Sequence, residues 1–302
     1  MGSYDNRFGG GGGLSIRFKM NQFMTSMYIL KTIRAEICSS IGFIHKVNHF
    51  IKSKKLSYKA SLFLIFVTAF SAQAQFKFDA EFGASFNTRN NVRYPNDENT
   101  TANLVDIPDQ LGTGQTAFLR LRASYTINDR HTISGLYAPL TFNSSGSFSR
   151  PIKFGNSIYT QNEVTDVSYK FNSYRLTYSY QIVDRKKIKF GLGLTGKIRD
   201  ARIGFNSGMK SDETTDLGFV PLINFRLDLY PTEKLLFTLN GDALVGPQGR
   251  AEDIFAGFEY SISDPIAIKL GYRILEGGAD VDQVYNFSLI HYASVGVIFT
   301  LK

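Results

Sequence analysis

Residues 76–86 read FKFDAEFGASF and alternate strictly between apolar and polar side chains. One face of this stretch, if it is extended, carries Phe76, Phe78, Ala80, Phe82, Ala84 and Phe86. The opposite face carries Lys77, Asp79, Glu81, Gly83 and Ser85. A period of two residues is typical of a β-strand that has one apolar and one polar face. The stretch therefore predicts a strand.

Similar alternating segments recur to the end of the chain. They cover residues 117–127, 131–142, 174–182, 188–197, 219–229, 235–245, 254–262, 266–274 and 285–301. Pro139 makes the third segment irregular, and the last also carries apolar residues at Ile290, Tyr292 and Ile298 on its otherwise polar face. No helical period competes with this pattern, so we expect ten strands, with eight or twelve as the alternatives.

The connections between these segments alternate in length. Short links are expected at 128–130, 184–186, 231–234 and 263–265, and long polar loops at 88–114, 143–162 and 206–216. A transmembrane barrel has short turns at its periplasmic end and long loops at its outer end. The pattern predicts an all-β, closed antiparallel up-and-down transmembrane β-barrel. Since periodicity does not reveal which face meets water, a soluble barrel is the alternative.

The segment before the first strand has the organisation of a secretory signal peptide. Lys52, Lys54, Lys55 and Lys59 form a basic start, residues 60–70 an apolar stretch, and Ala72-Gln73-Ala74 a cleavage motif before Gln75. The apolar stretch is shorter than the roughly 20 residues of a membrane-spanning helix, which disfavours an anchor. We therefore expect three parts: a mis-called or disordered extension (1–51), a signal peptide (52–74) and the barrel (75–302).

The distribution of charge argues against a nucleic-acid partner. The first 74 residues hold 10 of the 34 Lys and Arg and 2 of the 26 Asp and Glu, which leaves 24 of each sign in the remainder. A neutral mature chain has no electrostatic footprint for DNA or RNA. Cys38, the single cysteine, lies in the part that we expect to be removed, so no thiolate metal site is expected. We predict no cofactor and no metal.

From Gln75 to Lys302 the chain resembles the outer-membrane β-barrel proteins of Gram-negative bacteria, including barrel domains of unassigned function. The leader end SAQAQ followed by a barrel is similar to proteins of the Bacteroidota. The resemblance implies export to the outer membrane, a porin-like barrel at the cell surface, and contact with lipid, lipopolysaccharide and the barrel assembly machinery. The C-terminus departs from many such proteins because it lacks a terminal aromatic residue; Phe299 lies three positions earlier.

If the apolar faces meet lipid, the opposite faces bring charged side chains into a narrow lumen. These are Arg120, Arg122, Arg175, Lys189, Lys197, Arg226, Lys269 and Arg273, with Asp228, Asp242, Asp253 and Glu259. In a ten-stranded barrel we expect them to pair with one another and form a structural charge network. The alternative is a path for a small polar or anionic solute.

Two function classes follow from this interpretation. The first is a structural, surface-interaction or narrow-pore barrel. The second is an enzyme that acts on lipid or peptide at the outer rim. The mature chain holds two histidines, His131 and His291. His291 and Ser294 are three residues apart, which places them on opposite faces of a strand, and Ser288 has the same odd separation. We therefore predict no catalytic residues.

Overall fold

The computed structural model describes residues 74–97, 103–112, 115–247 and 249–301. The predicted extension and the predicted signal peptide up to Gln73 lie outside the described residues, so both stay predictions. The first strand begins at Ala74, one residue before the expected mature N-terminus at Gln75. Among the described residues no helix is long and apolar enough to cross a bilayer.

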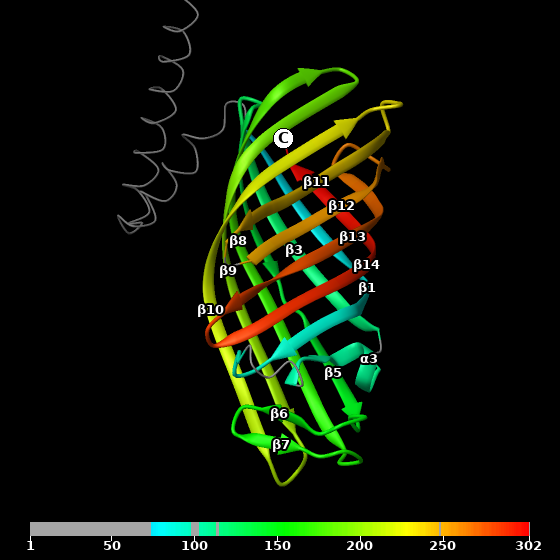
Figure 1. Cartoon of the computed structure of the whole chain (residues 1–302). Helices are drawn as coiled ribbons and strands as arrows, with labels where there is room; N and C mark the ends of the chain where they lie inside the picture. The colour runs from blue at the N-terminus through cyan, green and yellow to red at the C-terminus, as the bar shows by residue number, and fades with distance from the viewer. Residues whose placement is uncertain (1–73, 98–102, 113–114, 248, 302) are drawn as a thin grey trace, which may run out of the picture. The chain divides into compact units, whose positions relative to one another are not determined.

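The described chain forms a closed antiparallel barrel of ten strands, which confirms the predicted fold class (Figure 1). β14 pairs with β1 from Phe76 opposite Leu301 to Arg93 opposite Tyr285 and so closes the sheet. The barrel strands are β1 (Ala74–Arg93), β3 (Thr116–Ile127), β4 (His131–Ala138), β8 (Thr165–Arg185), β9 (Ile188–Asn206), β10 (Ser211–Leu229), β11 (Leu235–Gly246), β12 (Gly249–Ser261), β13 (Ile266–Val281) and β14 (Val284–Leu301).

Pro139 interrupts the third strand, as the sequence suggested. β4 pairs with both β3 and β8, whereas its continuation β5 (Thr141–Gly146) pairs with β8 alone. Proline has no backbone N–H for the ladder, which explains the break. Between β1 and β3 lie the short β2 (Val105–Asp106) and α3 (Ile107–Leu111), and between β5 and β8 lies the hairpin of β6 (Ile152–Phe154) and β7 (Ser157–Tyr159).

The short links lie at the end of the barrel that holds the chain's C-terminus. Asn128 and Asp129 both have positive φ, at 52° and 55°, as the two central residues of a type I′ turn require, and the Arg130 N–H donates to the Ile127 carbonyl at 3.2 Å. At the opposite end all three predicted loops overlap strands: residues 88–93 belong to β1, 143–146 to β5 and 211–216 to β10, so β9 and β10 are joined by residues 207–210 alone. Figure 1 shows β8, β9 and β10 reaching far beyond the neighbouring hairpins at this end.

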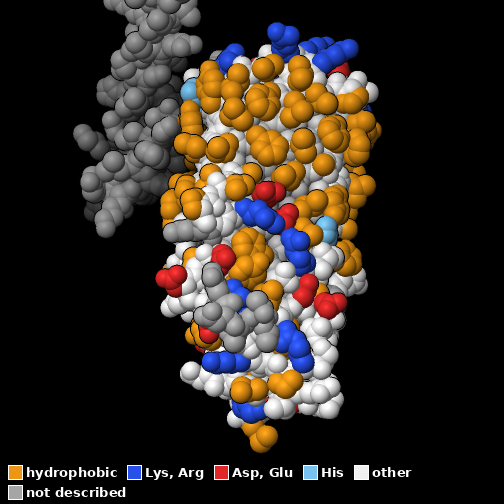
Figure 2. Space-filling view, viewed as in Figure 1, with side chains coloured by type: hydrophobic (Ala, Val, Ile, Leu, Met, Phe, Trp, Pro, Cys, Tyr) orange, Lys and Arg blue, Asp and Glu red, His pale blue; other side chains and the backbone are white. Residues whose placement is uncertain are grey.

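The polarity of the barrel wall changes along its strands. In β8 the outward-facing Leu176 and Tyr178 are 65% and 47% exposed, and the inward-facing Arg175 is buried. Farther toward the long-loop end of β8, the buried inward residues are Val167 and Tyr169. Figure 2 shows the consequence on one face of the barrel: apolar side chains gather at the end with the short links, and mixed polar side chains lie toward the other end. We call the first region the apolar band and the second the outer half.

Candidate functional site

Ion pairs fill the lumen inside the apolar band, and most of them join strands that are not neighbours in the sheet. Asp253 of β12 is their centre. Its Oδ2 accepts hydrogen bonds from Arg120 Nη2 at 2.9 Å and Arg175 Nη2 at 2.5 Å, and its Oδ1 accepts one from Arg273 Nη1 at 2.6 Å. Arg175 also donates to Asp242 at 2.6 Å. All five side chains are buried, so the charges compensate one another in place of water.

Glu81 extends this network to β1. Arg273 binds both of its carboxylate oxygens, at 2.9 and 2.8 Å, in a bidentate pair. Lys269 donates to Glu81 at 2.9 Å and to Asp79 at 2.7 Å, and the Ser294 hydroxyl donates to Glu81 at 3.0 Å. These residues and those around Asp253 together form what we call the charge layer.

A smaller cluster lies nearer the short-link end. Arg226 donates to Asp228 at 2.8 Å and to Glu259 at 3.3 Å, and Lys77 donates to Glu259 at 3.1 Å. The Thr238 hydroxyl donates a hydrogen bond of 2.7 Å to Asp228. The lumen therefore carries paired charges over most of the depth of the apolar band.

The structure brings nine of the twelve expected lumen charges into these two clusters, but three lie apart, one of them Lys197, whose Nζ lies 4.7 Å from the centroid of the Phe171 ring. Arg122 contacts the Ser134 hydroxyl at 3.3 Å, and Lys189 pairs with Asp184 at 3.1 Å in a half-exposed position near the short links. Lys77, Asp79 and Glu81 also belong to the clusters, although they were not among the predicted lumen charges. Their place on the polar face of residues 76–86 was the signal that could have found them.

Phe255 covers the charge layer with its aromatic ring. Lys269 Nζ and the Arg273 guanidinium lie 5.2 and 5.0 Å from the ring centroid, as in cation–π contacts. The ring lies against Gly257 and Gly271, which face each other across β12 and β13. A Cβ on Gly271 would fall 2.4 Å from the Phe255 ring, so only glycine leaves room for it.

A second, apolar layer fills the outer half. The long loops fold inward and bury Phe154 of β6 against Phe205 of β9, with ring centroids 4.0 Å apart and the planes within 4°. Phe148 and Tyr159 pack on the same Phe205 ring. This apolar layer contains Val92, Val105, Ile107, Phe118, Leu140, Phe142, Phe148, Ile152, Phe154, Tyr159, Val167, Tyr169, Ile203, Phe205, Leu275, Ile290 and Tyr292. It explains why Ile290 and Tyr292 break the alternation of the last strand.

Polar contacts fasten the β6–β7 hairpin to β9 and β10. Asp212 accepts hydrogen bonds from the Asn156 backbone N–H at 3.0 Å and from the Tyr159 hydroxyl at 3.2 Å. Burial and the Asp212 carboxylate together raise the pKa of Tyr159 to about 12. Glu163 accepts from the Thr160 backbone at 2.9 Å and from Lys210 at 2.9 Å. The hairpin is thus a fixed part of the outer half.

The histidines lie away from any serine partner. His291 faces outward and hydrogen-bonds the Tyr272 hydroxyl, whereas Ser294 is buried and donates to Glu81 in the lumen. The opposite faces expected from their spacing are thus present. His131, beside the 128–130 turn, contacts the Tyr178 hydroxyl at 2.9 Å.

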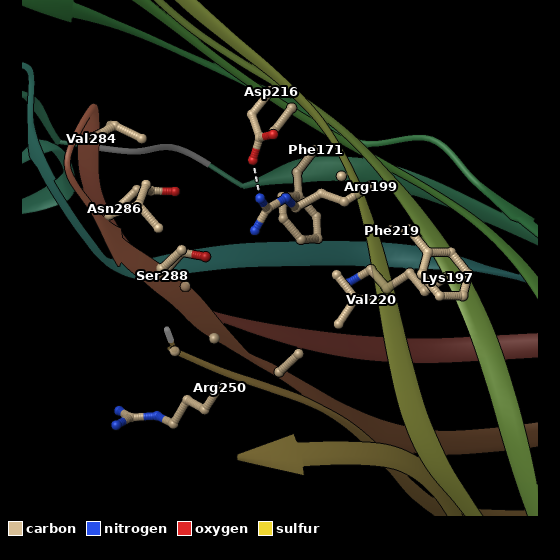
Figure 3. Close-up of a pocket in the computed structure, with 18 of the residues that line it drawn as sticks. Phe171, Lys197, Arg199, Asp216, Phe219, Val220, Arg250, Val284, Asn286 and Ser288 are labelled. Atoms are coloured by element: carbon tan, nitrogen blue, oxygen red, sulfur yellow. Dashed lines mark hydrogen bonds and ion pairs between the residues drawn. The ribbon is translucent and has the colours of Figure 1, made fainter. Parts of the chain in front are cut away.

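A cavity of about 520 Å³ lies in the outer half, beside the two layers. Figure 3 shows Lys197, Arg199 and Asp216 on the β9–β10 side of this cavity and Val284, Asn286 and Ser288 of β14 across from them. Arg199 pairs with Asp216. Lys197 was predicted to face the lumen, but the cavity could not be predicted from the sequence, because the wall of the cavity depends on where the strand pairings stop.

No family model and no curated protein matches the sequence. Solved structures of outer-membrane proteins do match it. The outer-membrane protease OmpT of Escherichia coli is 9% identical, with a TM-score of 0.46 over 75% of this chain and 97% of that one. The translocator domain of the autotransporter NalP of Neisseria meningitidis is 10% identical (0.38; 84% and 96%). Ail, the attachment invasion locus protein of Yersinia pestis, is 9% identical (0.36; 76% and 100%).

These three matches are distant, and the activities of the matched proteins do not carry over to this chain. The fold rests on this chain's own strand pairing, which defines a closed antiparallel β-barrel. At the level of the fold, the resemblance to outer-membrane β-barrel proteins is confirmed. A Bacteroidota origin stays a prediction.

Proposed function

We propose that this chain is embedded in the outer membrane of a Gram-negative bacterium, with its outer half at the cell surface. The outward faces support this placement: Leu176, Leu194 and Leu270 are 65%, 69% and 61% exposed on one continuous apolar band. Exposed apolar surface of this extent is typical of contact with lipid. The sheet also closes on itself through β14 and β1, as a sheet in hydrocarbon must.

Within that membrane the protein acts as a closed barrel that displays a folded outer half, and not as a solute pore. One observation carries this conclusion: two layers fill the lumen in series. The charge layer joins β1, β3, β8, β11, β12 and β13 through buried pairs. The apolar layer then packs the loops against β8, β9 and β14. A dissolved solute would have to pass both.

The outer half is accordingly the part that would meet lipopolysaccharide and external partners. Its loops are tied to one another and to the barrel, for instance by the Gly155 N–H to the Tyr94 carbonyl at 3.0 Å and by Arg150 to the Leu104 carbonyl at 2.8 Å. A preorganised surface of this kind suits recognition, since little ordering of the loops is needed on binding.

Planar-bilayer recording of the folded, processed protein tests closure. We expect the current to stay at the level of the bare bilayer in 1 M KCl at moderate voltage, with insertion verified by recovery of the protein from the same membrane. Arg122→Ala, at the edge of the charge layer, serves as the matched variant that should leave the barrel closed. Regular conductance steps from the unmodified protein would contradict the proposal.

A further inference from the structure

The barrel wall is incomplete along the seam between β10 and β11. β10 pairs with β9 over its whole length, from Ser211 to Leu229. Its pairing with β11 covers only the stretch from Ile223, opposite Ala243, to Leu229, opposite Phe237. Among the described residues no strand pairs with residues 211–222 of β10 on that side. The wall therefore has a side gap between this part of β10 and the tip of the β11–β12 hairpin.

The cavity of about 520 Å³ lies directly behind the side gap. Its lining includes Val220 and Pro221 of β10, and Leu244 and Arg250 at the hairpin tip. A volume of this size falls within the range of small-molecule sites. Pro221 also removes one backbone donor from the unpaired stretch, which disfavours covering the gap with an added strand.

Cationic groups dominate the charged lining. Lys197, Arg199 and Arg250 contribute three positive charges, against the carboxylates of Asp216 and Glu276, whereas Arg202 at the border of the cavity points outward and pairs with Glu213. Arg199 pairs with Asp216, but its buried Nε has no hydrogen-bond partner among the residues that the structure describes. The site thus has an excess of positive charge and an unused donor, both suited to an anionic group.

Lys197 is the central feature of the site. Its side chain is buried, and within the described part of the chain the Phe171 ring, 4.7 Å from Nζ, is its recorded partner, with no carboxylate in ion-pair range. A buried ammonium without a counter-ion is costly, and buried charges in proteins are normally paired. Figure 3 shows the amine lying beside Val220, at the inner side of the gap. A ligand that enters there would supply the missing anion.

The side gap also lies at the boundary of the apolar band. Phe219 and Ile198 face outward at this level and are 71% and 47% exposed, while the next outward residues, Leu217 and Asp200, mark the change to mixed polarity. An acyl chain could therefore stay in the band while an acidic headgroup reaches Lys197. A water-soluble anion would contact the cationic lining but would leave the apolar surface at the gap unused.

We propose that the cavity binds a single-chain amphiphile with an acidic headgroup, which enters from the outer leaflet through the side gap. Lys197 holds the headgroup, with Arg199 beside it, and the chain lies in the gap between Val220 and Leu244. The inference rests on the membrane location proposed above.

Native mass spectrometry of the folded, processed protein in dodecyl maltoside tests the site, with dodecyl phosphate as the probe. The detergent has the same tail and a neutral headgroup, so retention of the probe reports on the acidic group. We expect one bound molecule per barrel. Lys197→Met should weaken binding about tenfold or more, the factor that corresponds to losing one charge-assisted hydrogen bond. Lys197→Arg should retain binding.

Two controls complete the test. Lys189→Met removes a lysine from the same strand, at the other end of the barrel, and should bind like the unmodified protein. Inorganic phosphate should not displace the probe at equal concentration. Equal binding by Lys197→Met that still folds, or displacement by inorganic phosphate, would overturn the proposal; the second result would indicate a simple anion site open to the external solution.

Because the chain contains no tryptophan, the fluorescence of a single introduced tryptophan gives an independent measure of binding. Leu244→Trp places a single reporter at the gap, and Leu239→Trp places one on the outer face of the same strand. Dodecyl phosphate brominated in its tail should quench the first saturably at one equivalent and the second only weakly. Equal quenching of both would contradict the site.

A protein that proves water-soluble would refute the membrane location, whereas a membrane barrel that fails to bind would refute only this inference.

Discussion

Arg175 of β8 and Asp253 of β12 form a buried ion pair of 2.5 Å that crosses the lumen between strands that are not neighbours in the sheet. Hydrogen bonds between adjacent strands determine the order and register of the strands in the wall, but they do not hold the side chains of the lumen in place. Because Asp253 also binds Arg120 and Arg273, opposite sides of the barrel are held by one carboxylate. This relationship explains how a barrel with a charged interior can be closed.

Replacing that carboxylate should be costly. Asp253→Asn leaves three buried guanidinium groups with too little negative charge, and breaking a buried pair from one side typically costs about 3 to 5 kcal/mol. We expect a loss of that size in the free energy of unfolding, measured by urea titration of the protein in vesicles. Asp184→Asn, whose pair with Lys189 is half-exposed, should cost less than about 1 kcal/mol. Similar losses for the two variants would contradict a central role for Asp253.

The apolar layer should depend on Phe205. Phe205→Ala removes the ring against which Phe154 and Phe148 stack, and buried Phe→Ala changes cost about 3 to 5 kcal/mol. We expect faster amide hydrogen exchange in the β6–β7 hairpin while the rest of the barrel keeps its protection. Leu217→Ala, which is 76% exposed, provides the control and should leave exchange unchanged. An unaltered hairpin in Phe205→Ala would show that other contacts hold it.

Gly271 should not tolerate a side chain. In Gly271→Ala the new methyl group would meet the Phe255 ring at 2.4 Å and the Ala256 carbonyl at 2.6 Å. Overpacking of this kind costs about 1 to 3 kcal/mol, which thermal unfolding in vesicles would detect. The matched variant is Gly135→Ala, where no atom lies within 4 Å of the added Cβ. Equal stability of the two variants would mean that Phe255 can move away freely.

The outer half should loosen in acid through Glu163. Three neighbouring groups lower the pKa of Glu163 from 4.5 to about 2: the Ser207 hydroxyl, the Thr160 backbone N–H and the Lys210 amine. The Ser207 hydroxyl acts by its proximity, since it makes no hydrogen bond of standard geometry to a described residue. A lowered folded-state pKa means that the stabilisation is fully present above pH 4.5 and is lost as the pH falls through about 2. We therefore expect hairpin exchange to accelerate across this window.

Glu163→Gln should weaken that pH dependence, because its side chain does not titrate. Part of the dependence should remain, since hydrogen bonds from Ser157, Asn156 and Tyr159 outweigh burial and lower the pKa of Asp212 as well. Glu213→Gln, on the exposed face of β10, is the matched control and should follow the unmodified profile. A profile unchanged in Glu163→Gln would assign the acid effect to another group.

The apolar band could be predicted from sequence because lipid demands a strict alternation. Residues 76–86 and 174–182 show it without ambiguity, and both became strands with their apolar side chains outward. The outer half could not be predicted in the same way. There the strands carry buried Ile203 and Phe205 inward and Arg202 outward, so the polarity is inverted and residues 211–216 resembled a polar loop.

The site was predictable only in part. Alternation alone placed Arg120, Arg175 and Arg273 in the lumen, because facing direction follows from residue parity. Which carboxylate pairs with which guanidinium depends on the relative register of distant strands. The sequence of a single segment does not determine that register. The side gap arises for the same reason: β10 is longer than β11, and only their register shows where the pairing ends.

The central claim is that the chain is a membrane-embedded closed barrel with its apolar band toward lipid. Electrophoresis of the protein from outer-membrane fractions, with and without boiling, tests it most directly. We predict that the unboiled protein is found in the detergent-solubilised membrane fraction and migrates faster than the boiled protein, because the closed barrel stays folded in the denaturing detergent. A water-soluble protein whose mobility does not change on boiling would contradict the claim.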